Sequence, residues 1–360
     1  LMLGGATNMF TGCAAPPPPW LKEKYAIDID AEVDQTMKEL GIKPLPEDLR
    51  GDASTRVAEA AQSLGYDWQP QPKFMNPARA ERFDCGAKCM LGCRCGAKWT
   101  ACEYVDEAGA AGAKVVTRAR VDRVLVEGNR CVGVAGRRFE ARAGTVVLCA
   151  GGIGTPRILQ ASGFSEAGVG MTMDTTVMVY GFGEDTGIGK EPPMTWSWVN
   201  DADGYMLATL ADPWLMYPII TMLKGPKYVM TWPRWRNLLG IMIKLKDDIS
   251  GGVFPDGRIS KPTTEHDKQG LTRAEQVCRE ILVAAGADPG TLYVSPQRGT
   301  HPSGTVRLGT MLNEDLRTET PGLYVCDASV FPEALCRPTV LTIIGLAKRL
   351  ARHVVSEASS

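Results

Sequence analysis

Residues 143–156 read AGTVVLCAGGIGTP, and this stretch decides the class of fold. The run Thr145–Leu148 is short, apolar and mostly β-branched, which is typical of a buried parallel strand. It ends in a glycine turn that contains Ala150 and Gly151, and we expect a helix to begin near Pro156. Such a turn lets backbone N–H groups approach a phosphate, a ribose or a base edge. The third glycine of GxGxxG is missing, so an ordinary tight turn is the alternative.

A second stretch, HPSGTVRLG from His301 to Gly309, places a histidine in a glycine-containing loop. Histidine is a common general base near neutral pH, although a lone histidine more often has a structural role. The chain holds only three histidines. We expect His353 near the end of the last helix and His266 in a polar loop, so His301 is the one in the setting of a site.

The third stretch, GLYVCDASVFP at residues 322–332, predicts a short buried strand that ends at Asp327. A carboxylate there can hold a sugar hydroxyl or a bound water. The segment RPTVLT at residues 337–342 then leads into a terminal helix whose start can face an electron-rich ring. A plain strand, turn and helix with a capping aspartate is an equal alternative.

Together, in this order and at this spacing, the three stretches resemble the glucose-methanol-choline (GMC) oxidoreductases, and in particular their long-chain-alcohol members. The similarity covers most of residues 85–350, with a weaker match at residues 92–134. The resemblance implies an α/β and α+β fold: a Rossmann-like FAD-binding domain with a substrate domain built on an antiparallel sheet. It predicts FAD-binding parts at residues 1–165 and 293–360 and the substrate domain at residues 166–292.

The resemblance also implies roles for individual residues. His301 matches the histidine that takes the hydroxyl proton while hydride moves to flavin N5. The positions expected to contact FAD are Gly4, Gly5 and Ala6 beside the pyrophosphate and isoalloxazine; Val121, Ala150 and Gly151 on the adenosine side; and Asp327, Ala328 and Thr339 near the flavin.

Two positions depart from the family pattern. The second catalytic position, usually His or Asn, falls at Arg337 or Pro338, and the asparagine expected after the glycine loop falls near Met9 or Phe10. A guanidinium at Arg337 would stabilise an anionic reduced flavin, which is our hypothesis for the first departure. The family also begins with a βαβ unit bearing GxGxxG. No such unit precedes Gly4, so we expect an incomplete flavin domain that needs a missing N-terminal segment or a partner chain.

Local patterns predict the remaining elements. We expect a helix at Ser54–Leu64, a strand opening at Val115-Val116, a hairpin around Glu127-Gly128-Asn129 and a largely antiparallel sheet within Val169–Val253. Three further features are a hairpin turn at Pro255-Asp256-Gly257, a helix whose capping box is Thr272 with Glu275, and a last helix after Pro338.

Composition limits the function classes. Forty basic and 41 acidic residues give a net charge of −1, which argues against a nucleic-acid partner. Eleven cysteines without a signal-peptide pattern favour a reduced, cytoplasmic protein. The most apolar window, Met206–Leu223, is interrupted by Asp212 and Pro213, so we predict no transmembrane segment and favour a buried strand and loop over membrane contact.

Four cysteines lie within eleven residues, at Cys85, Cys89, Cys93 and Cys95. Zinc or an iron–sulfur cluster can be held by four thiolates, but neither usual spacing of such sites is present. We therefore predict no metal and leave the question to a metal measurement.

The sequence thus predicts FAD-dependent oxidation of an alcohol, with oxygen or another electron acceptor. The region Val169–Val253 is rich in methionine and holds five of the eight tryptophans, which favours an apolar substrate. The alternatives are a split flavoprotein or pseudoenzyme without activity alone, and a lyase or decarboxylase of the same fold.

Overall fold

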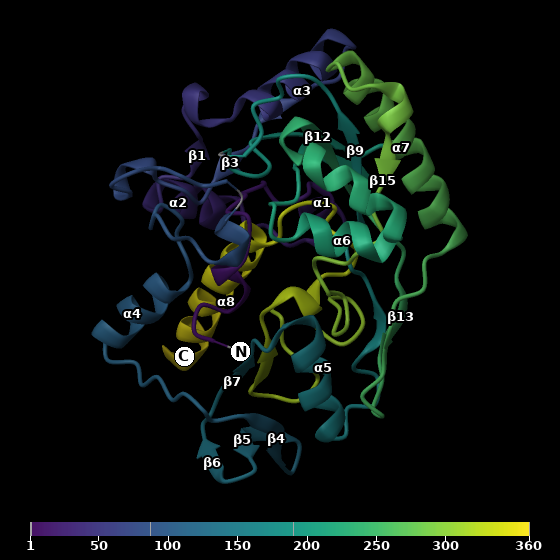
Figure 1. Ribbon diagram of the computed structural model, residues 1–360. Helices are drawn as coiled ribbons and strands as arrows, with labels where there is room; N and C mark the ends of the chain where they lie inside the picture. The colour runs from purple at the N-terminus through teal and green to yellow at the C-terminus, as the bar shows by residue number, and fades with distance from the viewer. Residues whose placement is uncertain (1, 87, 190, 360) are drawn as a thin grey trace.

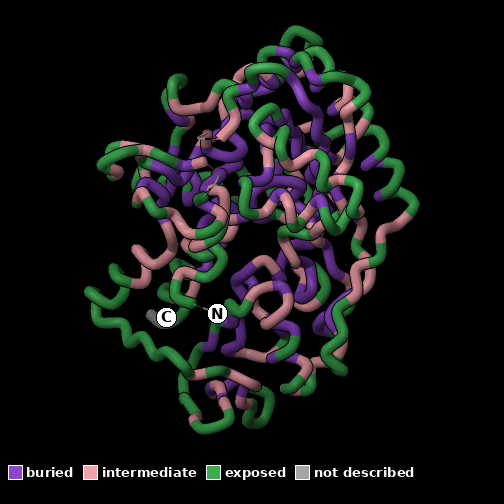
Figure 2. The backbone as a smooth tube through the Cα atoms, in the orientation of Figure 1, coloured by how far each residue is buried: buried purple, intermediate pink, exposed green. Residues whose placement is uncertain are grey.

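The computed structural model describes residues 2–86, 88–189 and 191–359. It has two parts, which Figure 1 shows one above the other. The upper part is built on a six-stranded sheet. The lower part gathers α5, β7 and the C-terminal segment, and buried backbone is concentrated in these two regions (Figure 2).

The six-stranded sheet is antiparallel throughout and has the order β15-β9-β12-β11-β10-β2. Its strands are β2 (Gln69–Pro70), β9 (Thr176–Phe182), β10 (Trp196–Asn200), β11 (Tyr205–Thr209), β12 (Leu238–Leu245) and β15 (Tyr293–Val294). The antiparallel sheet predicted within Val169–Val253 is confirmed. Every residue of the central strands β9 and β12 is buried, which requires that both faces of the sheet are covered.

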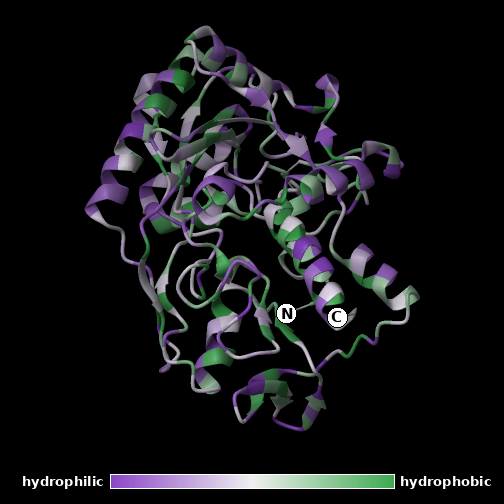
Figure 3. Ribbon diagram, turned by 180° about the vertical axis from the view of Figure 1, so that it is seen from behind, coloured by the Kyte–Doolittle hydropathy of each residue, from purple (hydrophilic) through white to green (hydrophobic). Residues whose placement is uncertain are grey.

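Alternate residues of each strand pack on opposite faces, as the pleat of a strand requires. Val177 and Val179 of β9 pack with the helices α3 (Asp52–Ser63) and α7 (Glu265–Ala284). Met178 and Tyr180 of the same strand pack beneath α6 (Tyr217–Lys224) and the 3₁₀ segment η5 (Pro226–Asn237). The helix α7 turns its hydrophilic side outward, as Figure 3 shows by colour.

The lower part contains the parallel pair β7 (Val146–Leu148) and β16 (Leu323–Val325). The helix α5 (Gly151–Ala161) follows β7, and the last helix, α8 (Val340–Ser359), packs against α2 (Asp30–Glu39). The parallel strand predicted from TVVL and the last helix predicted after Pro338 are therefore confirmed, but the strand is only partly buried, because Val147 in its middle is 41% exposed.

Smaller elements complete the molecule. One three-stranded sheet consists of β4 (Val121–Glu127), β5 (Arg130–Gly136) and β6 (Phe139–Arg142), and another of β8 (Val169–Met171), β13 (Ser250–Val253) and β14 (Ile259–Ser260). Two residues each form β1 (Lys43–Pro44) and β3 (Pro72–Lys73). The further helices are α1 (Trp20–Tyr25) and α4 (Cys102–Ala110), with the 3₁₀ turns η1 (Gly5–Asn8), η2 (Glu47–Leu49), η3 (Pro77–Arg79), η4 (Lys88–Leu91), η6 (Pro289–Thr291) and η7 (Ala328–Val330). Both predicted hairpins and the predicted helix near Ser54–Leu64 are confirmed.

The predicted start of α5 at Pro156 is wrong, because the helix begins at Gly151 and contains Pro156. A proline inside a helix leaves the carbonyl four residues earlier without its usual donor. That carbonyl belongs to Gly152, and it accepts a hydrogen bond of 2.9 Å from the Thr305 hydroxyl. A residue distant in sequence thus supplies the bond that Pro156 cannot make.

The predicted capping box of Thr272 with Glu275 is also wrong. The helix α7 begins at Glu265, where Thr264 and Asp267 form the capping box. Thr272 lies inside the helix, and its hydroxyl donates to the Lys268 carbonyl. The predicted strand at Val115-Val116 is absent as well, since this described segment is exposed and has no regular structure.

The hydrophobic clusters partly follow the predicted division of the chain. One cluster joins residues from both predicted FAD-binding parts, and another joins the antiparallel sheet with α7. Within residues 1–165, however, α3 packs on the substrate sheet and β2 extends it. The domain division itself stays a prediction.

Candidate active site

Backbone hydrogen bonds bring the three diagnostic stretches together. Val306 and Leu308 donate to the carbonyls of Ser329 and Val330, over 2.9 and 3.0 Å, so the histidine loop lies along the segment after β16. On its other side, the loop approaches α5 so closely that a Cβ on Gly152 would lie 2.0 Å from the Pro302 carbonyl oxygen. The site is therefore assembled where β7 and β16 both end. The carboxyl ends of parallel strands are the usual place for ligands in such sheets.

Asp327 joins the ends of the two strands. One of its carboxylate oxygens accepts the Gly151 N–H over 2.8 Å and the Thr155 hydroxyl over 2.5 Å. The other oxygen accepts the Ser329 N–H over 2.7 Å. Asp327 thus caps α5 and holds the turn that follows β16, which fixes Ala150, Gly151 and Ala328 around one carboxylate.

The segment that carries His301 runs antiparallel to the segment that leads into β9. Thr172 and Ser303 exchange two backbone hydrogen bonds of 2.9 Å, and Thr176 pairs with Arg298 in the same way. The N–H of His301 donates to the Met173 carbonyl over 3.0 Å. This pairing sets His301 opposite Asp174.

His301 Nδ1 lies 2.7 Å from the Asp174 carboxylate. The Asp174 side chain is 1% exposed, whereas the His301 side chain keeps 24% of its surface accessible. The other Asp174 oxygen accepts the Cys336 N–H over 3.0 Å. A carboxylate at Nδ1 favours the tautomer whose free lone pair is on Nε2, so this arrangement prepares Nε2 to accept a proton.

A buried lysine lies close to this pair. Lys244, on β12, is almost fully buried, and its ammonium donates to the Thr300 hydroxyl over 2.7 Å. Burial lowers the pKa of His301, the Lys244 charge lowers it further, and Asp174 opposes both effects. The net effect favours the neutral imidazole, which is the form that a base requires.

Sequence reasoning missed Asp174, Lys244 and Thr300. Asp174 is separated from His301 by 127 residues and lies in an ordinary run of Met and Thr. Its one unusual local feature is a backbone φ of 47°, which an amino-acid sequence does not reveal.

Arg337 is buried and forms an ion pair with Asp201, in the turn between β10 and β11. Its Nε also donates to the Leu335 carbonyl over 3.1 Å. Pro338 and Thr339 follow directly and lead into α8. Because Cys336 bonds to Asp174, this segment lies beside the histidine pair.

The residues around Asp327 fit a flavin cofactor on two observations. A Cβ built on Gly151, whose φ is 81°, meets no atom within 4 Å, so the backbone is open at this turn. The hydroxyls of Ser329 and Thr342 are buried without a hydrogen-bond partner among the described residues. An open glycine backbone and unsatisfied hydroxyls next to a helix start are suitable for the polar groups of a dinucleotide.

The other expected FAD contacts lie on separate elements. Gly4 lies against Cys102 at the start of α4, and Gly5 and Ala6 form η1 beside it. Val121 begins β4 and pairs with Gly136. That sheet meets the far end of α5, where Ser162 accepts the Val124 N–H over 2.9 Å. Among the described residues, no hydrogen bond or ion pair joins these positions to Asp327.

The four cysteines between residues 85 and 95 lie in two different environments. Cys85 and Cys89 are buried in a small cluster with Leu45 and Met75. Cys93 and Cys95 are partly exposed, with their sulfur atoms 3.6 Å apart. Among the described residues, the group whose atoms converge closely enough to surround a metal is Asp248, His266 and Asp267, and it contains no thiol.

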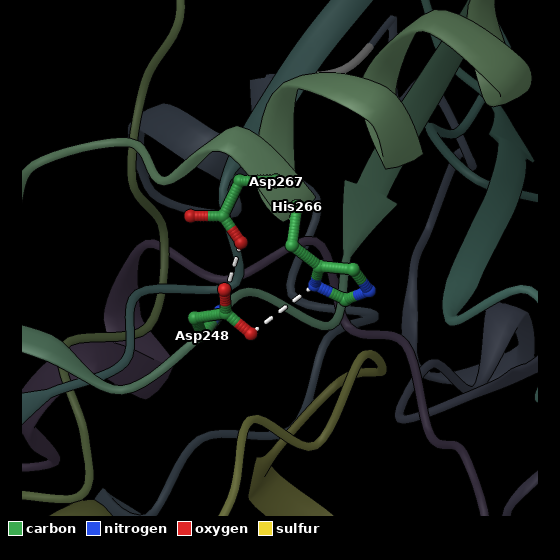
Figure 4. Close-up of side chains that lie close together, drawn as sticks. All are labelled: Asp248, His266 and Asp267. Atoms are coloured by element: carbon green, nitrogen blue, oxygen red, sulfur yellow. Dashed lines mark hydrogen bonds and ion pairs between the residues drawn. The ribbon is translucent and has the colours of Figure 1, made fainter.

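The group of Asp248, His266 and Asp267 is part of the N-terminal cap of α7 (Figure 4). Asp248 accepts from the Thr264 hydroxyl over 2.5 Å and lies 3.1 Å from His266 Nδ1. Asp267 accepts the backbone N–H groups of Asp248 and Thr264 over 2.9 and 3.0 Å. These bonds account for the carboxylates as helix-capping groups. His266 therefore lies in the first turn of α7, and the polar loop predicted for it is wrong.

Comparison with known proteins identifies the protein family of this chain. Two family models described as GMC oxidoreductase match the chain, the N-terminal one at residues 21–178 and the C-terminal one at residues 248–347. The chain belongs to the GMC oxidoreductase family, whose members are oxidoreductases that typically bind FAD.

Three relatives show what the chain is similar to at the level of whole proteins. An uncharacterized protein of Methanocaldococcus jannaschii is 30% identical over 92% of this chain and 81% of its own length. A long-chain-alcohol oxidase of Arabidopsis thaliana is 24% identical over 75% of this chain and 46% of its own. An oxygen-dependent choline dehydrogenase of Pseudomonas savastanoi is 33% identical over 43% of this chain and 26% of its own. The match to the latter two thus spans less than half of their length.

A solved structure supports the fold. The crystal structure of a pyridoxine 4-oxidase from Mesorbium loti matches with a TM-score of 0.62 at 18% identity, over 86% of this chain and 71% of that one. Among the described residues, no helix has the length and apolar character needed to cross a bilayer.

Proposed function

We propose that this chain catalyses the FAD-dependent oxidation of an alcohol to an aldehyde or ketone, with His301 as the base. The observation that carries the proposal is the pair His301–Asp174, held 2.7 Å apart beside the Asp327 segment. Membership of the GMC family supplies the reaction class. FAD, when bound, supplies the group that accepts hydride from the alcohol carbon.

The chain's own residues manage the proton. Nε2 of His301 takes the hydroxyl proton, and the buried Asp174 carboxylate stabilises the resulting imidazolium. Lys244 and burial keep the imidazole neutral beforehand, as the lowered pKa of His301 indicates. His301, Asp174 and Lys244 together therefore keep a base available at neutral pH, while the Asp174 carboxylate stays buried and away from the substrate.

We assign Ala150, Gly151, Asp327, Ala328 and Thr339 to FAD, with Gly4, Gly5, Ala6 and Val121 as further contacts implied by the family pattern. The open backbone at Gly151 and the unpartnered hydroxyls of Ser329 and Thr342 support this assignment.

The substrate is a small-molecule alcohol, and we propose an apolar one. The hydrophobic cluster beneath α6 contains four buried methionines, namely Met178, Met194, Met206 and Met242. Methionine side chains adapt to apolar ligands of varied shape. The similarity to a long-chain-alcohol oxidase agrees with this choice, and oxygen or another acceptor would reoxidise the flavin.

Anaerobic flavin reduction tests the proposal. Purified protein that retains FAD is mixed with a panel of linear, cyclic and cationic alcohols, and the flavin absorbance is followed. We expect bleaching, fastest with apolar alcohols, and a carbonyl product in equal amount. A flavin that stays oxidised with the whole panel would favour the lyase or decarboxylase alternative. Protein that binds no FAD would favour the pseudoenzyme or split alternative.

Arg337 is proposed to stabilise the anionic reduced flavin. Its ion pair with Asp201 already balances the guanidinium charge in part. We therefore expect Arg337→Ala to lower the flavin reduction potential modestly, and Asp201→Asn to raise it, because that variant frees the guanidinium. An unchanged potential and reduction rate in both variants would refute the role.

A further inference from the structure

The segment from Pro213 to Asn237, which we call the α6–η5 platform, covers one face of the six-stranded sheet (Figure 1). Side-chain hydrogen bonds join its two halves, α6 and η5. The Tyr217 hydroxyl donates to Thr231 over 2.9 Å, and the Trp232 indole donates to Thr221 over 2.9 Å. Tyr217 and Thr221 are the buried residues of α6, so polar bonds hold the inner side of the helix.

The outer side of the platform is apolar, which reverses the usual pattern of a surface helix. Seven large hydrophobic side chains between Trp214 and Met230 are 38–80% exposed, out of 21 such residues in the whole described chain. They are Trp214, Leu215, Ile219, Met222, Leu223, Val229 and Met230. Single exposed residues are ordinary, but a third of them within 17 residues marks an interaction surface.

The platform is also purely basic. It carries the exposed side chains of Lys224, Lys227, Arg234 and Arg236, and no ion pair is found for them among the described residues. The sequence contains no acidic residue between Asp212 and Asp247. Asp212 itself is buried and paired with Arg298. A chain with a net charge of −1 thus concentrates four cations around its largest run of exposed apolar residues.

We propose that the α6–η5 platform docks on the surface of an anionic lipid bilayer. Leucine, isoleucine, methionine and tryptophan side chains enter the boundary between headgroups and acyl chains, while lysine and arginine contact lipid phosphates. A second copy is a poor occupant, because a two-fold contact would set four cations against four.

The proposal goes beyond the proposed oxidation and does not depend on it. The platform covers the methionine-rich sheet face through Tyr217, Trp232 and Trp235. Docking would therefore turn this side of the substrate domain toward the lipid phase.

Vesicle co-sedimentation of the full chain tests the proposal. Phosphatidylcholine vesicles with and without phosphatidylglycerol are compared at low and high salt. We expect binding to the anionic vesicles that weakens with salt, and little binding to neutral ones. Lys224→Gln with Lys227→Gln should weaken binding about fivefold per removed charge. Leu215→Ser with Leu223→Ser should weaken it about tenfold per side chain.

Matched controls lie on other surfaces. Arg120→Gln removes an exposed cation, and Val355→Ser removes an exposed apolar side chain. Both should leave vesicle binding unchanged, and circular dichroism should show all variants folded. If the wild type did not bind anionic vesicles, the proposal would be overturned. It would also be overturned if the control variants lost as much vesicle binding as the platform variants. Self-association that the platform variants abolish, without vesicle binding, would assign the surface to a second copy instead.

Discussion

Two of the histidine–aspartate pairs among the described residues have similar contact geometry and different surroundings. His301 lies 2.7 Å from Asp174, and His266 lies 3.1 Å from Asp248. The side chains of the second pair are 66% and 41% exposed, whereas Asp174 is 1% exposed. Water screens the exposed pair, whereas the buried carboxylate interacts with its histidine through a medium of lower dielectric constant and is screened less. Burial, more than contact distance, therefore distinguishes the proposed base from the helix-capping histidine.

Replacing the histidines should give the largest contrast. We expect His301→Asn to slow flavin reduction by about 10²–10⁴-fold, since the proton acceptor is lost. His266→Asn should leave the rate unchanged. Stopped-flow absorbance under anaerobic conditions measures both. Similar rates for the two variants would remove His301 from the mechanism.

The aspartates provide the next contrast. Asp174→Asn keeps the size of the side chain but removes the charge that stabilises the imidazolium, so we expect a loss of roughly a hundredfold. Asp248→Asn is the matched control and should not affect reduction. A positioning role for Asp174 also requires that the pH dependence changes, which a merely destabilised protein would not show.

Lys244 should set the pH range of the reaction. Burial and the Lys244 charge lower the pKa of His301, so the rate of the wild type should fall at a pH below the ordinary histidine value of about 6.5. Lys244→Met removes the charge, raises the pKa of His301 and moves this fall to higher pH, so the rate should be lower than that of the wild type in the acidic range and unchanged near pH 9. Lys246→Met, which breaks a surface pair with Glu333, is the control. Superimposable profiles for Lys244→Met and wild type would contradict the assignment.

The smallest expected effect concerns stability alone. Thr264→Ala removes the cap of α7 and should lower the free energy of unfolding by about 1 kcal/mol. Thr272→Ala, inside the same helix, should be neutral or slightly stabilising. Denaturant unfolding measures both, and flavin reduction should be unchanged in each. If Thr272→Ala were the more damaging variant, the cap would be misassigned.

Local patterns identified elements whose residue types show the signal directly, even where the strand partners are distant in sequence. The parallel strand at Thr145–Leu148, the antiparallel sheet and the last helix follow from apolar periodicity and turn residues. The start of α5 could not be predicted in this way, because Asp327 caps it from 176 residues away. The start of α7 was visible in the spacing of Thr264 and Asp267, but a capping box more often uses Glu or Gln.

By itself, the sequence determined that His301, Gly151 and Asp327 belong to one recurrent pattern, because residue type and spacing along the chain carry that information. Only the tertiary structure decided which groups act on His301. Asp174 and Lys244 reach it through strand pairing and burial, and both depend on contacts across more than fifty residues. Electrostatic strength follows distance and local dielectric, and neither quantity is a property of the sequence read residue by residue.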